Sequence, residues 1–334
     1  MRGLIKSFQN GFLNFLKNKI YLTISLIFIM LKLQKIYVIL GPTASGKTVM
    51  SIKLAKKIGG EIISADSRQV YKGLDIGTGK VTKKEMAGIP HHLLDVASPK
   101  RQFTVAEYQK LALRKIDEII ARGKTPIIVG GTGFYIQAIT ENLVLPDVLP
   151  NPKLRTRLAK KTAAELFTIL KKLDPARAKT IDAKNPVRLI RAIEIAKAIG
   201  KVPELTMDPR RILSSFAGGG DDRRKYVKIG LKIPQEELNK KIKKRLLARL
   251  KQGMVAEAKR LHNKGLSWKR MEQLGLEYRY LARFLQGKIN KQEMIDQLYS
   301  AIVKYSKRQM TWFKRDKEII WSKNQKEAFD VLKK

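Results

Sequence analysis

Short apolar runs alternate with helix-like stretches along the first part of the chain. Three runs have the length and composition of buried strands, namely residues 36–40, 61–65 and 126–129. Helical spacing covers residues 48–57 and 104–121. Thr104 and Glu107 form a capping box where the second of these helices begins. Strands that alternate with helices predict a parallel sheet covered by helices, with its ligand site at the carboxyl ends of the strands.

The pattern changes at about Asn142, where several prolines mark a boundary. The sequence then predicts two helical stretches, at residues 153–173 and 187–199, and a loose glycine-rich segment at 207–222. A strand follows at 226–233, then a series of long helices over 234–317 and a last short strand at 318–321. We therefore expect an α/β core that is interrupted by an all-helical insertion. The predicted parts are an N-terminal extension (1–35), the first part of the core (36–141), the helical insertion (142–221) and a basic, helix-rich completion of the core (222–334).

Residues 20–33 form an almost wholly apolar run that is flanked by lysines. The run is shorter than the ~20 apolar residues that span a bilayer. No small-residue cleavage site follows it before the first predicted strand. We expect Met30 to be the true start, with residues 1–29 an upstream in-frame extension, and we expect no stable membrane association. The alternative is a weak helix that lies on a membrane surface.

Charge and composition narrow the class of protein. The 334 residues carry 69 Lys and Arg against 29 Asp and Glu, a formal net charge of +40. The excess is concentrated in residues 222–334, which hold 31 basic and 12 acidic residues. Such a surface attracts polyanions and favours a nucleic acid partner. The absence of cysteine excludes disulfides, thiolate metal sites and a catalytic thiol, and it is typical of a reducing, cytoplasmic compartment.

A phosphate-binding loop directly follows the first predicted strand. Residues 41–48 have the pattern G-x-x-x-x-G-K-[ST] between a strand and a helix. The glycines let several backbone N–H groups point inward, and the N-terminus of the helix adds positive potential. We expect Lys47 to reach the distal phosphate and Thr48 to ligate Mg²⁺. The loop predicts a P-loop NTPase-like core that binds a diphosphate or a triphosphate, and its residues leave open which one.

Seven polar or glycine-rich segments carry the most specific signal in the sequence. They are residues 41–48, 66–71 (DSRQVY), 75–80 (DIGTGK), 91–95 (HHLLD), 130–133 (GGTG), 185–192 (NPVRLIRA) and 306–313 (SKRQMTWF). In this order they resemble the tRNA dimethylallyltransferase family. The resemblance extends over about residues 36–321 and leaves out residues 1–29.

This resemblance implies an activity and a set of site residues. The family transfers a dimethylallyl group from its diphosphate to N6 of adenosine 37, beside the anticodon of tRNA. The residues implied at the diphosphate leaving group, with Mg²⁺ assisting through the last of them, are Gly41, Thr43, Ala44, Ser45, Gly46, Lys47 and Thr48. Asp66 looks like the general base that accepts the proton of the adenine amine. The alternative is that Asp66 only caps a turn or holds a metal ion.

The resemblance also implies contacts to the anticodon stem-loop of tRNA. An adenine must leave its stack to reach a buried allylic carbon. The residues implied to hold its edge are Asp66, Ser67, Arg68, Gln69 and Thr132. In the insertion, Val187, Arg188 and Arg191 look like tRNA contacts, against the alternative of a solvated helix face.

Several other positions have expected roles. Lys259 stands where many relatives carry arginine, on a helix thought to reach the diphosphate, and it is a candidate ligand there. A basic cluster in the last helix could hold RNA phosphates or form a solvated face, namely Lys304, Lys307 and Arg308. The pair His91-His92 is expected to be structural. The aromatic residues expected in the core are Trp312, Phe313 and Trp321.

Four functions remain to be separated. The leading hypothesis is an RNA-modifying prenyltransferase, which we expect to be a monomer. A prenyltransferase that acts on free adenylate would need neither the insertion nor the basic C-terminal third. A small-molecule kinase, suggested by the phosphate loop alone, would bind and consume ATP. A non-catalytic RNA-binding module would leave Asp66 and the phosphate loop without a purpose.

Overall fold

The computed structural model describes residues 35–204, 224–324 and 327–329. The chain divides into two compact units. The core unit combines Met1–Thr140 with Ser214–Lys334, and the helical unit is Glu141–Leu213. The predicted N-terminal extension with Met30, its apolar run and the glycine-rich segment 207–222 lie outside the described residues, apart from Lys35.

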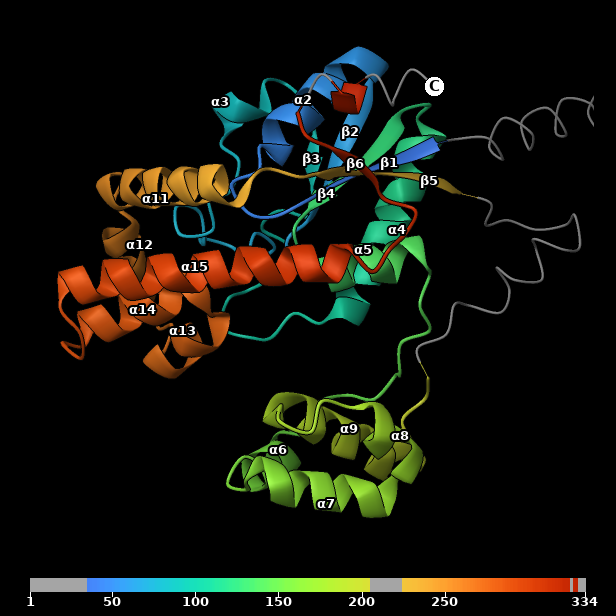
Figure 1. Ribbon diagram of the computed structural model, residues 1–334, viewed down its shortest axis with the longest axis vertical. Helices are drawn as coiled ribbons and strands as arrows, with labels where there is room; N and C mark the ends of the chain where they lie inside the picture. The colour runs from blue at the N-terminus through green and yellow to red at the C-terminus, as the bar shows by residue number, and fades with distance from the viewer. Residues whose placement is uncertain (1–34, 205–223, 325–326, 330–334) are drawn as a thin grey trace, which may run out of the picture. The chain divides into compact units, whose positions relative to one another are not determined.

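The core unit is built on a six-stranded sheet in the order β3-β2-β4-β1-β5-β6 (Figure 1). Every pair of neighbouring strands is parallel. The strands are β1 (Lys35–Leu40), β2 (Gly60–Ala65), β3 (His91–His92), β4 (Thr125–Gly130), β5 (Lys225–Leu231) and β6 (Ile320–Ser322). The predicted parallel sheet is confirmed. Only the two-residue strand β3 was not predicted, because it is too short to show a periodic pattern.

Helices cover both faces of this sheet, because neighbouring strand residues point to opposite sides. On one face, α2 (Lys47–Ile58) packs with Ile39 and Ile62 in one apolar cluster. On the other, α4 (Val105–Ala121) and α5 (Gly133–Thr140) pack with Val38 and Ile63 in a second cluster. The capping box of Thr104 and Glu107 is present, as the sequence predicts.

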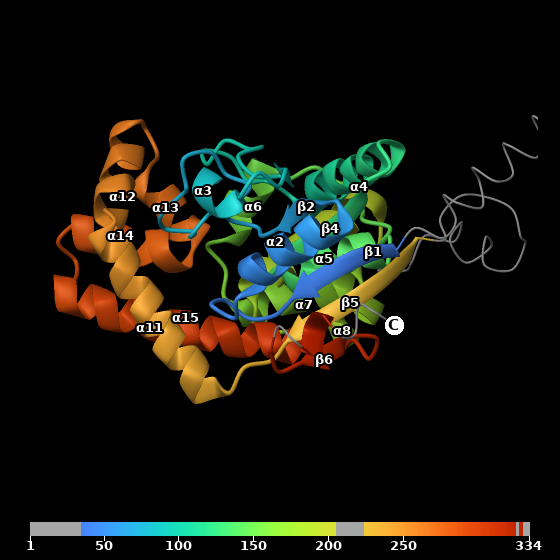
Figure 2. The same ribbon diagram turned by 90° about the horizontal axis from the view of Figure 1, so that it is seen from above.

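Five helices of the C-terminal part lie beside the sheet, drawn in orange and red in Figures 1 and 2. They are α11 (Gln235–Lys251), α12 (Met254–Asn263), α13 (Trp268–Leu274), α14 (Leu276–Leu285) and α15 (Lys291–Phe313). α11, α12, α14 and α15 share a third apolar cluster. The buried stripe of α15 continues past this cluster to Gln309 and Phe313, so the helix joins the bundle to the sheet. A short helix, α3 (Lys83–Met86), precedes β3.

The glycines after β4 are explained by the close approach of α15. A Cβ atom on Gly131 would lie 2.3 Å from Gln309 Nε2, and one on Gly133 would lie 2.1 Å from Trp312 Cδ1. Phe313 is buried, and Trp312 and Trp321 pack against the same cluster, so the expected core role of these aromatic residues is confirmed.

Replacing Gly133 by alanine should destabilise the core unit by about 1–3 kcal/mol, the usual cost of overpacking. The higher helix propensity of alanine offsets at most about 1 kcal/mol of this loss. Chemical denaturation of the purified protein measures the difference. A second substitution, Trp312→Leu, should recover part of the loss, and an unchanged free energy of unfolding in Gly133→Ala would contradict the clash.

The described residues of the helical unit form four helices around a small apolar cluster. They are α6 (Pro152–Leu158), α7 (Ala163–Leu173), α8 (Pro175–Thr180) and α9 (Pro186–Ile199). The all-helical character is as predicted, and the helical stretch expected at 153–173 consists of the two helices α6 and α7. Thr162 and Glu165 form a capping box that starts a new helix, which separates α6 from α7. No helix of the described parts of either unit is long and apolar enough to span a membrane.

Candidate active site

The phosphate loop joins the carboxyl end of β1 to the N-terminus of α2. Gly41, Ala44 and Gly46 have positive φ angles of 148°, 62° and 90°, which wind the backbone into a tight loop. Ser45 Oγ is buried and makes no hydrogen bond to any described residue. Because buried hydroxyl groups are normally hydrogen-bonded, we expect this hydroxyl to bond to an oxygen atom of an anion bound in the loop.

Lys47 is held by carbonyl groups of the phosphate loop. Its Nζ donates to the carbonyl oxygens of Gly41 and Pro42, at 3.0 and 2.7 Å. Burial, helped by the Arg245 guanidinium and opposed by the Asp66 carboxylate, lowers the pKa of Lys47 to about 7. A phosphate group at this ammonium would favour its charged form and raise the pKa again.

Two arginines of α11 line the same cavity as Lys47, and sequence reasoning missed both. Arg245 Nη2 donates to the carbonyl of Gly79 at 3.1 Å, and Arg249 Nη1 donates to the carbonyl of Gly77 at 2.7 Å. Burial and the neighbouring Arg249 lower the pKa of Arg245 to about 10. Lys47, Arg245 and Arg249 are among six lysine and arginine side chains that line the cavity, and the pKa values of Lys47 and Arg245 are lowered. The site is therefore suited to a multiply charged anion.

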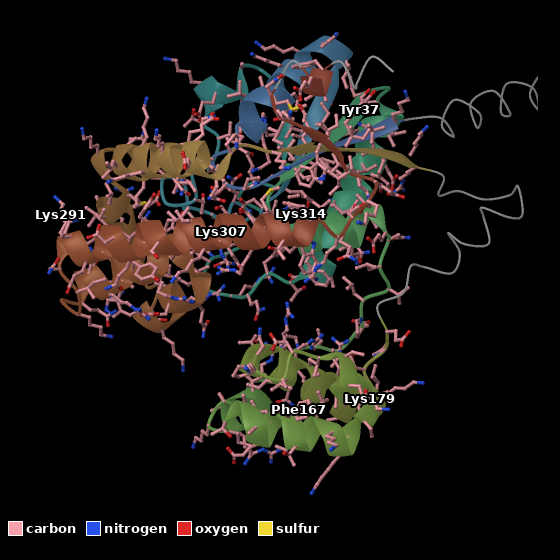
Figure 3. The ribbon with its side chains drawn as sticks, viewed as in Figure 1. Tyr37, Phe167, Lys179, Lys291, Lys307 and Lys314 are labelled. Carbon is pink, nitrogen blue, oxygen red and sulfur yellow. The ribbon has the colours of Figure 1, made fainter. Side chains whose placement is uncertain are left out.

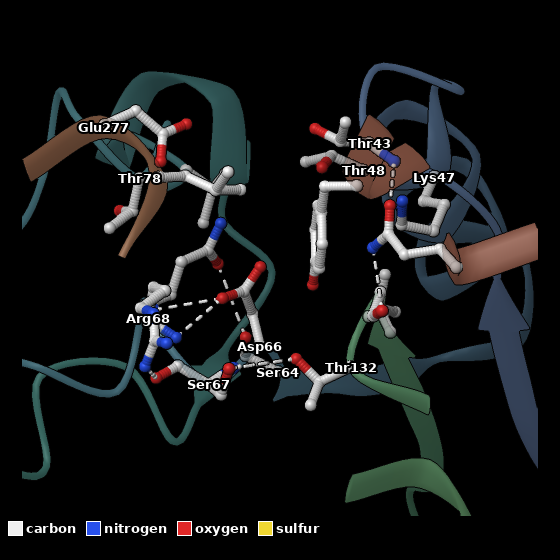
Figure 4. Close-up of a pocket in the computed structure, with 18 of the residues that line it drawn as sticks. Thr43, Lys47, Thr48, Ser64, Asp66, Ser67, Arg68, Thr78, Thr132 and Glu277 are labelled. Atoms are coloured by element: carbon white, nitrogen blue, oxygen red, sulfur yellow. Dashed lines mark hydrogen bonds between the residues drawn. The ribbon is translucent and has the colours of Figure 1, made fainter. Parts of the chain in front are cut away.

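Asp66 follows β2 and lies between two walls of the cavity, with Arg68 on one side and Lys47 on the other (Figure 4). Its Oδ1 accepts from the backbone N–H groups of Arg68 and Gln69, at 2.8 and 3.3 Å. These two bonds fix the carboxylate in a turn. Oδ2 receives no hydrogen bond from the described chain, so this oxygen is available to accept a proton.

The residues that follow Asp66 are linked to the end of β4. The backbone N–H of Ser67 donates to Thr132 Oγ1 at 3.0 Å, and Thr132 Oγ1 donates to Ser67 Oγ at 3.3 Å. Gln69 Nε2 donates to the carbonyl of Gly79 at 3.4 Å. Burial, with the Asp66 carboxylate adding to it, raises the pKa of Tyr305 in this cavity to about 12, so its phenol stays neutral.

These groups surround a cavity of about 480 Å³ at the carboxyl ends of the strands. Predicted site residues that line it are Thr43, Lys47, Thr48, Asp66, Ser67, Arg68, Gln69 and Thr132. The remaining predicted loop residues, Gly41, Ala44, Ser45 and Gly46, shape the phosphate loop beside it. Part of the wall is apolar and would suit a short hydrocarbon group, with contributions from Ile62, Val81, Val129, Leu276 and Ile302.

Lys259 does not join the other predicted residues of the diphosphate site. It is exposed on α12 and does not line the cavity, whereas Arg245 and Arg249 on α11 do. Its neighbour in sequence, Ala258, is buried, so the apolar face of α12 turns Lys259 toward solvent. A role of Lys259 at the diphosphate therefore stays a prediction without support from its position, whereas the two arginines lie where an anion in the cavity could be bound.

The candidate tRNA contacts of the helical unit differ from one another. Val187 is 77% exposed at the start of α9, and Arg188 beside it is exposed with no acidic partner in the described part of the unit. Arg191 instead pairs with the buried Glu194 and donates to the carbonyl of Val148 at 2.9 Å. Arg191 therefore has partners inside the unit that Arg188 lacks, and its contact with tRNA stays a prediction.

The two adjacent histidines have protein partners. His92 Nε2 contacts Glu61 Oε2 at 2.6 Å, and His91 Nδ1 donates to the carbonyl of Ile89 at 2.8 Å. Burial lowers the pKa of His91, which keeps its ring neutral. No cluster of three or more acidic or histidine side chains that could hold a metal ion exists among residues 35–204, 224–324 and 327–329. A magnesium ion at Thr48 would therefore take most of its ligands from the diphosphate and water.

Comparisons with known proteins show the family of this chain. A sequence profile described as IPP transferase matches residues 69–316. The chain is 45% identical over 279 residues to tRNA dimethylallyltransferase 2 of Treponema denticola, covering 83% of this chain and 91% of that protein. It is 41% identical over 291 residues to the tRNA dimethylallyltransferase of Anoxybacillus flavithermus, covering 86% and 90%.

Solved structures of tRNA-modifying transferases are also similar to this chain. The full-length tRNA isopentenylpyrophosphate transferase of Bacillus halodurans superposes with a TM-score of 0.65 at 35% identity, covering 89% of this chain and 94% of that one. A eukaryotic dimethylallyltransferase acting on tRNA gives a TM-score of 0.67 at 26% identity, covering 84% and 70%. The chain belongs to the IPP transferase family.

Proposed function

We propose that this protein transfers a dimethylallyl group from dimethylallyl diphosphate to N6 of adenosine 37 in tRNA. The observation that carries the proposal is that the free oxygen of Asp66 opens on the same cavity as the phosphate-loop lysine. A proton acceptor beside an anion site suits a reaction in which an amine attacks carbon and a diphosphate leaves.

The cations of the cavity would stabilise the leaving group. As the C–O bond of the donor breaks, negative charge grows on the diphosphate oxygens. Lys47 lies on the phosphate loop, and Arg245 and Arg249 lie on α11, so cations from two separate elements can neutralise this negative charge. Ser45 Oγ would offer a further hydrogen bond, and the N-terminus of α2 would add positive potential.

Magnesium fits this arrangement through Thr48, whose exposed side chain lies at the cavity beside Lys47. When bound, the ion would neutralise charge on the diphosphate and orient it. The protein's own part is to present the Thr48 hydroxyl and to hold the diphosphate with Lys47. Magnesium dependence of the reaction is accordingly part of the proposal.

Asp66 would act as the general base. The N6 amine forms a bond to the allylic carbon while the C–O bond to the diphosphate breaks, and the amine proton passes to Asp66 Oδ2. The transfer consumes one donor molecule and releases diphosphate, so no further reactant is needed. The Asp66 turn keeps Oδ1 on the backbone N–H groups of Arg68 and Gln69, which aims Oδ2 at the cavity.

An extruded adenine would be held on the side of Ser67, Arg68, Gln69 and Thr132. The hydrogen bonds between Ser67 and Thr132 join β2 to β4 and keep this wall in place. Exposed basic side chains would hold the RNA backbone around the site. Figure 3 labels Lys291 and Lys307 on α15 and Lys314 directly after it.

One assay separates the proposal from its alternatives. The protein is incubated with labelled dimethylallyl diphosphate, Mg²⁺ and bulk tRNA, and the digested tRNA is searched for N6-modified adenosine. Label in free adenylate instead would indicate a nucleotide prenyltransferase. Consumption of ATP with phosphate on a small product would indicate a kinase. Binding of tRNA with no label transfer in any arm would leave only an RNA-binding module.

Replacing Arg188 by alanine should weaken tRNA binding and lower its salt dependence, because one phosphate contact fewer releases about one counterion fewer. The slope of log Kd against log salt, measured by fluorescence anisotropy, should fall by about 0.9. Lys171→Ala, on α7 of the same unit, is the matched control and should leave the slope unchanged. An unchanged slope in Arg188→Ala would count against the contact.

Three further attributes belong to the proposal. The enzyme is expected to act as a monomer, since the cavity is completed by elements of one chain. It is expected to read the anticodon stem-loop, the part of tRNA that carries the reacting base. Its expected location is the cytoplasm, where its tRNA substrate is found.

A further inference from the structure

Glu257 of α12 is a buried carboxylate that binds backbone N–H groups instead of a cation. It is 3% exposed. Its Oε2 accepts from the N–H groups of Asp75 and Ile76 at 3.0 and 2.7 Å. Its Oε1 accepts from the N–H of Gly77 at 2.9 Å and from the hydroxyl of Tyr278 at 2.7 Å. One side chain therefore holds three successive peptide groups of the segment that we call the 75–80 loop (residues 75–80).

The 75–80 loop is also the surface on which the two cavity arginines rest. Arg249 donates to the carbonyl of Gly77, and Arg245 donates to the carbonyl of Gly79. Gly79 has a φ of +58°, and a Cβ atom there would lie 2.3 Å from Arg245 Nη2. The guanidinium lies directly against the loop backbone. A shift of the loop would therefore displace the carbonyl partners of both α11 arginines and leave Arg249, among the described residues, with only the carboxylate of Glu277, at 3.2 Å.

We propose that Glu257 is the positioning residue for the arginine half of the anion site. This inference rests on the proposed function, because it assumes that Arg245 and Arg249 bind the diphosphate. Glu257 touches neither the reacting atoms nor the anion. It fixes the N–H side of the 75–80 loop, and the carbonyl side of the same loop then fixes the two guanidinium groups.

Glutamine is the informative replacement at this position. It has the shape of glutamate, but its amide presents one oxygen and one NH₂ group. Either orientation of the amide sets the NH₂ group against at least one backbone N–H of the 75–80 loop. A buried donor that faces another donor is left unsatisfied, which costs about 1–3 kcal/mol. The loop should therefore move away from Glu257→Gln and take the arginines with it.

Binding of inorganic diphosphate to the full chain, measured by isothermal titration calorimetry, tests the inference without relying on prenyl transfer. Glu257→Gln should weaken the diphosphate affinity about 10-fold or more, as expected for lost hydrogen bonds to a charged group. Its tRNA affinity should stay within about twofold of wild type, since phosphate contacts at distant sites are additive. The matched control Arg260→Ala changes an exposed residue of the same helix and should keep the wild-type diphosphate affinity.

A double-mutant cycle separates positioning from a general loss of stability. Because Glu257 is proposed to act through both Arg245 and Arg249, Glu257→Gln should lower the diphosphate affinity less in the Arg249→Met background than in wild type, since only its effect through Arg245 remains. Equal effects in both backgrounds would overturn the inference. So would a well-folded Glu257→Gln protein that binds diphosphate like wild type.

A second variant keeps the test valid if Glu257→Gln does not fold. Tyr278→Phe removes only one of the four donors to the carboxylate and should weaken diphosphate binding about threefold. If this variant alone can be measured, wild-type affinity for diphosphate would overturn the inference. A wild-type protein that binds no diphosphate would instead overturn the proposed function itself, so the two failures are distinguishable.

Discussion

Replacing Asp66 by asparagine should lower kcat for prenyl transfer about 10²–10⁴-fold, the range that general base catalysis contributes. The amide oxygen of asparagine can still accept from the N–H groups of Arg68 and Gln69, so the turn should keep its shape. The NH₂ group then replaces the oxygen that faces the cavity and cannot take the amine proton. Single-turnover measurements with saturating tRNA and dimethylallyl diphosphate give the rate of the chemical step.

Binding measurements provide the control for this variant. The affinities of Asp66→Asn for tRNA and for diphosphate should stay close to wild type, because neither depends on proton transfer. Asp66→Ala loses the turn as well as the base, so it should impair both the rate and the fit of the adenine. A single-turnover rate within threefold of wild type in Asp66→Asn would remove the base assignment.

Lys47→Met should weaken diphosphate binding about 10²-fold, because hydrogen bonds to charged groups contribute about 1.5–3 kcal/mol. In the wild-type protein the same contact makes binding depend on pH. The pKa of Lys47 is about 7 in the ligand-free cavity, and a bound anion raises it. Above pH 7 the lysine must therefore take up a proton as diphosphate binds, and the affinity should fall as pH rises from 7 towards 9.

Calorimetry in buffers of different ionisation enthalpy measures this proton uptake directly. At pH 8 it should approach one proton for each diphosphate bound, after correction for the ionisation of diphosphate itself. Lys47→Met should lose the uptake, and Lys47→Arg should keep the charge while losing the pH dependence. Uptake that is equal in wild type and Lys47→Met would show that another group titrates.

Local patterns in the sequence predict much of this fold. The strand–loop–helix around residues 41–48 and the capping box at Thr104 depend on neighbours within a few residues, and the structure has both. Asp66 is predictable because it follows a strand of a parallel sheet and belongs to a segment that resembles the family. Its place at the cavity follows from these local facts together with the parallel topology.

Contacts between distant segments account for what the sequence did not reveal. Arg245 and Arg249 lie among many lysines and arginines, so the sequence does not distinguish them from basic residues of a solvated surface. The feature that could have identified them is their position on the helix. Ile242 and Leu246 belong to the buried face of α11, and both arginines lie on or beside that face. A cation on an apolar stripe needs a partner from elsewhere in the chain, here the carbonyls of the 75–80 loop.

Gln309 is a second example of the same kind. It accepts from the N–H of Thr43 at 2.9 Å and donates to the carbonyl of Gly131 at 2.8 Å, so one side chain ties the phosphate loop to the end of β4. Its segment of α15 resembles a segment of the family, but the partners of its side chain lie in the first half of the chain and cannot be read from that segment. Lys259 shows the reverse case, because a match in sequence position did not bring the side chain to the cavity.

The position of β5 in the sheet has a consequence for synthesis of the protein on the ribosome. β1 pairs on one side with β4 and on the other with β5, whose first residue is Lys225. While translation passes through the helical unit, a nascent chain therefore holds β1 with one edge unpaired, and such edges invite association with other chains. We expect the phosphate loop to gain its protection from proteolysis only after β5 has left the exit tunnel. Arrested chains of increasing length, treated briefly with protease, would reveal that step.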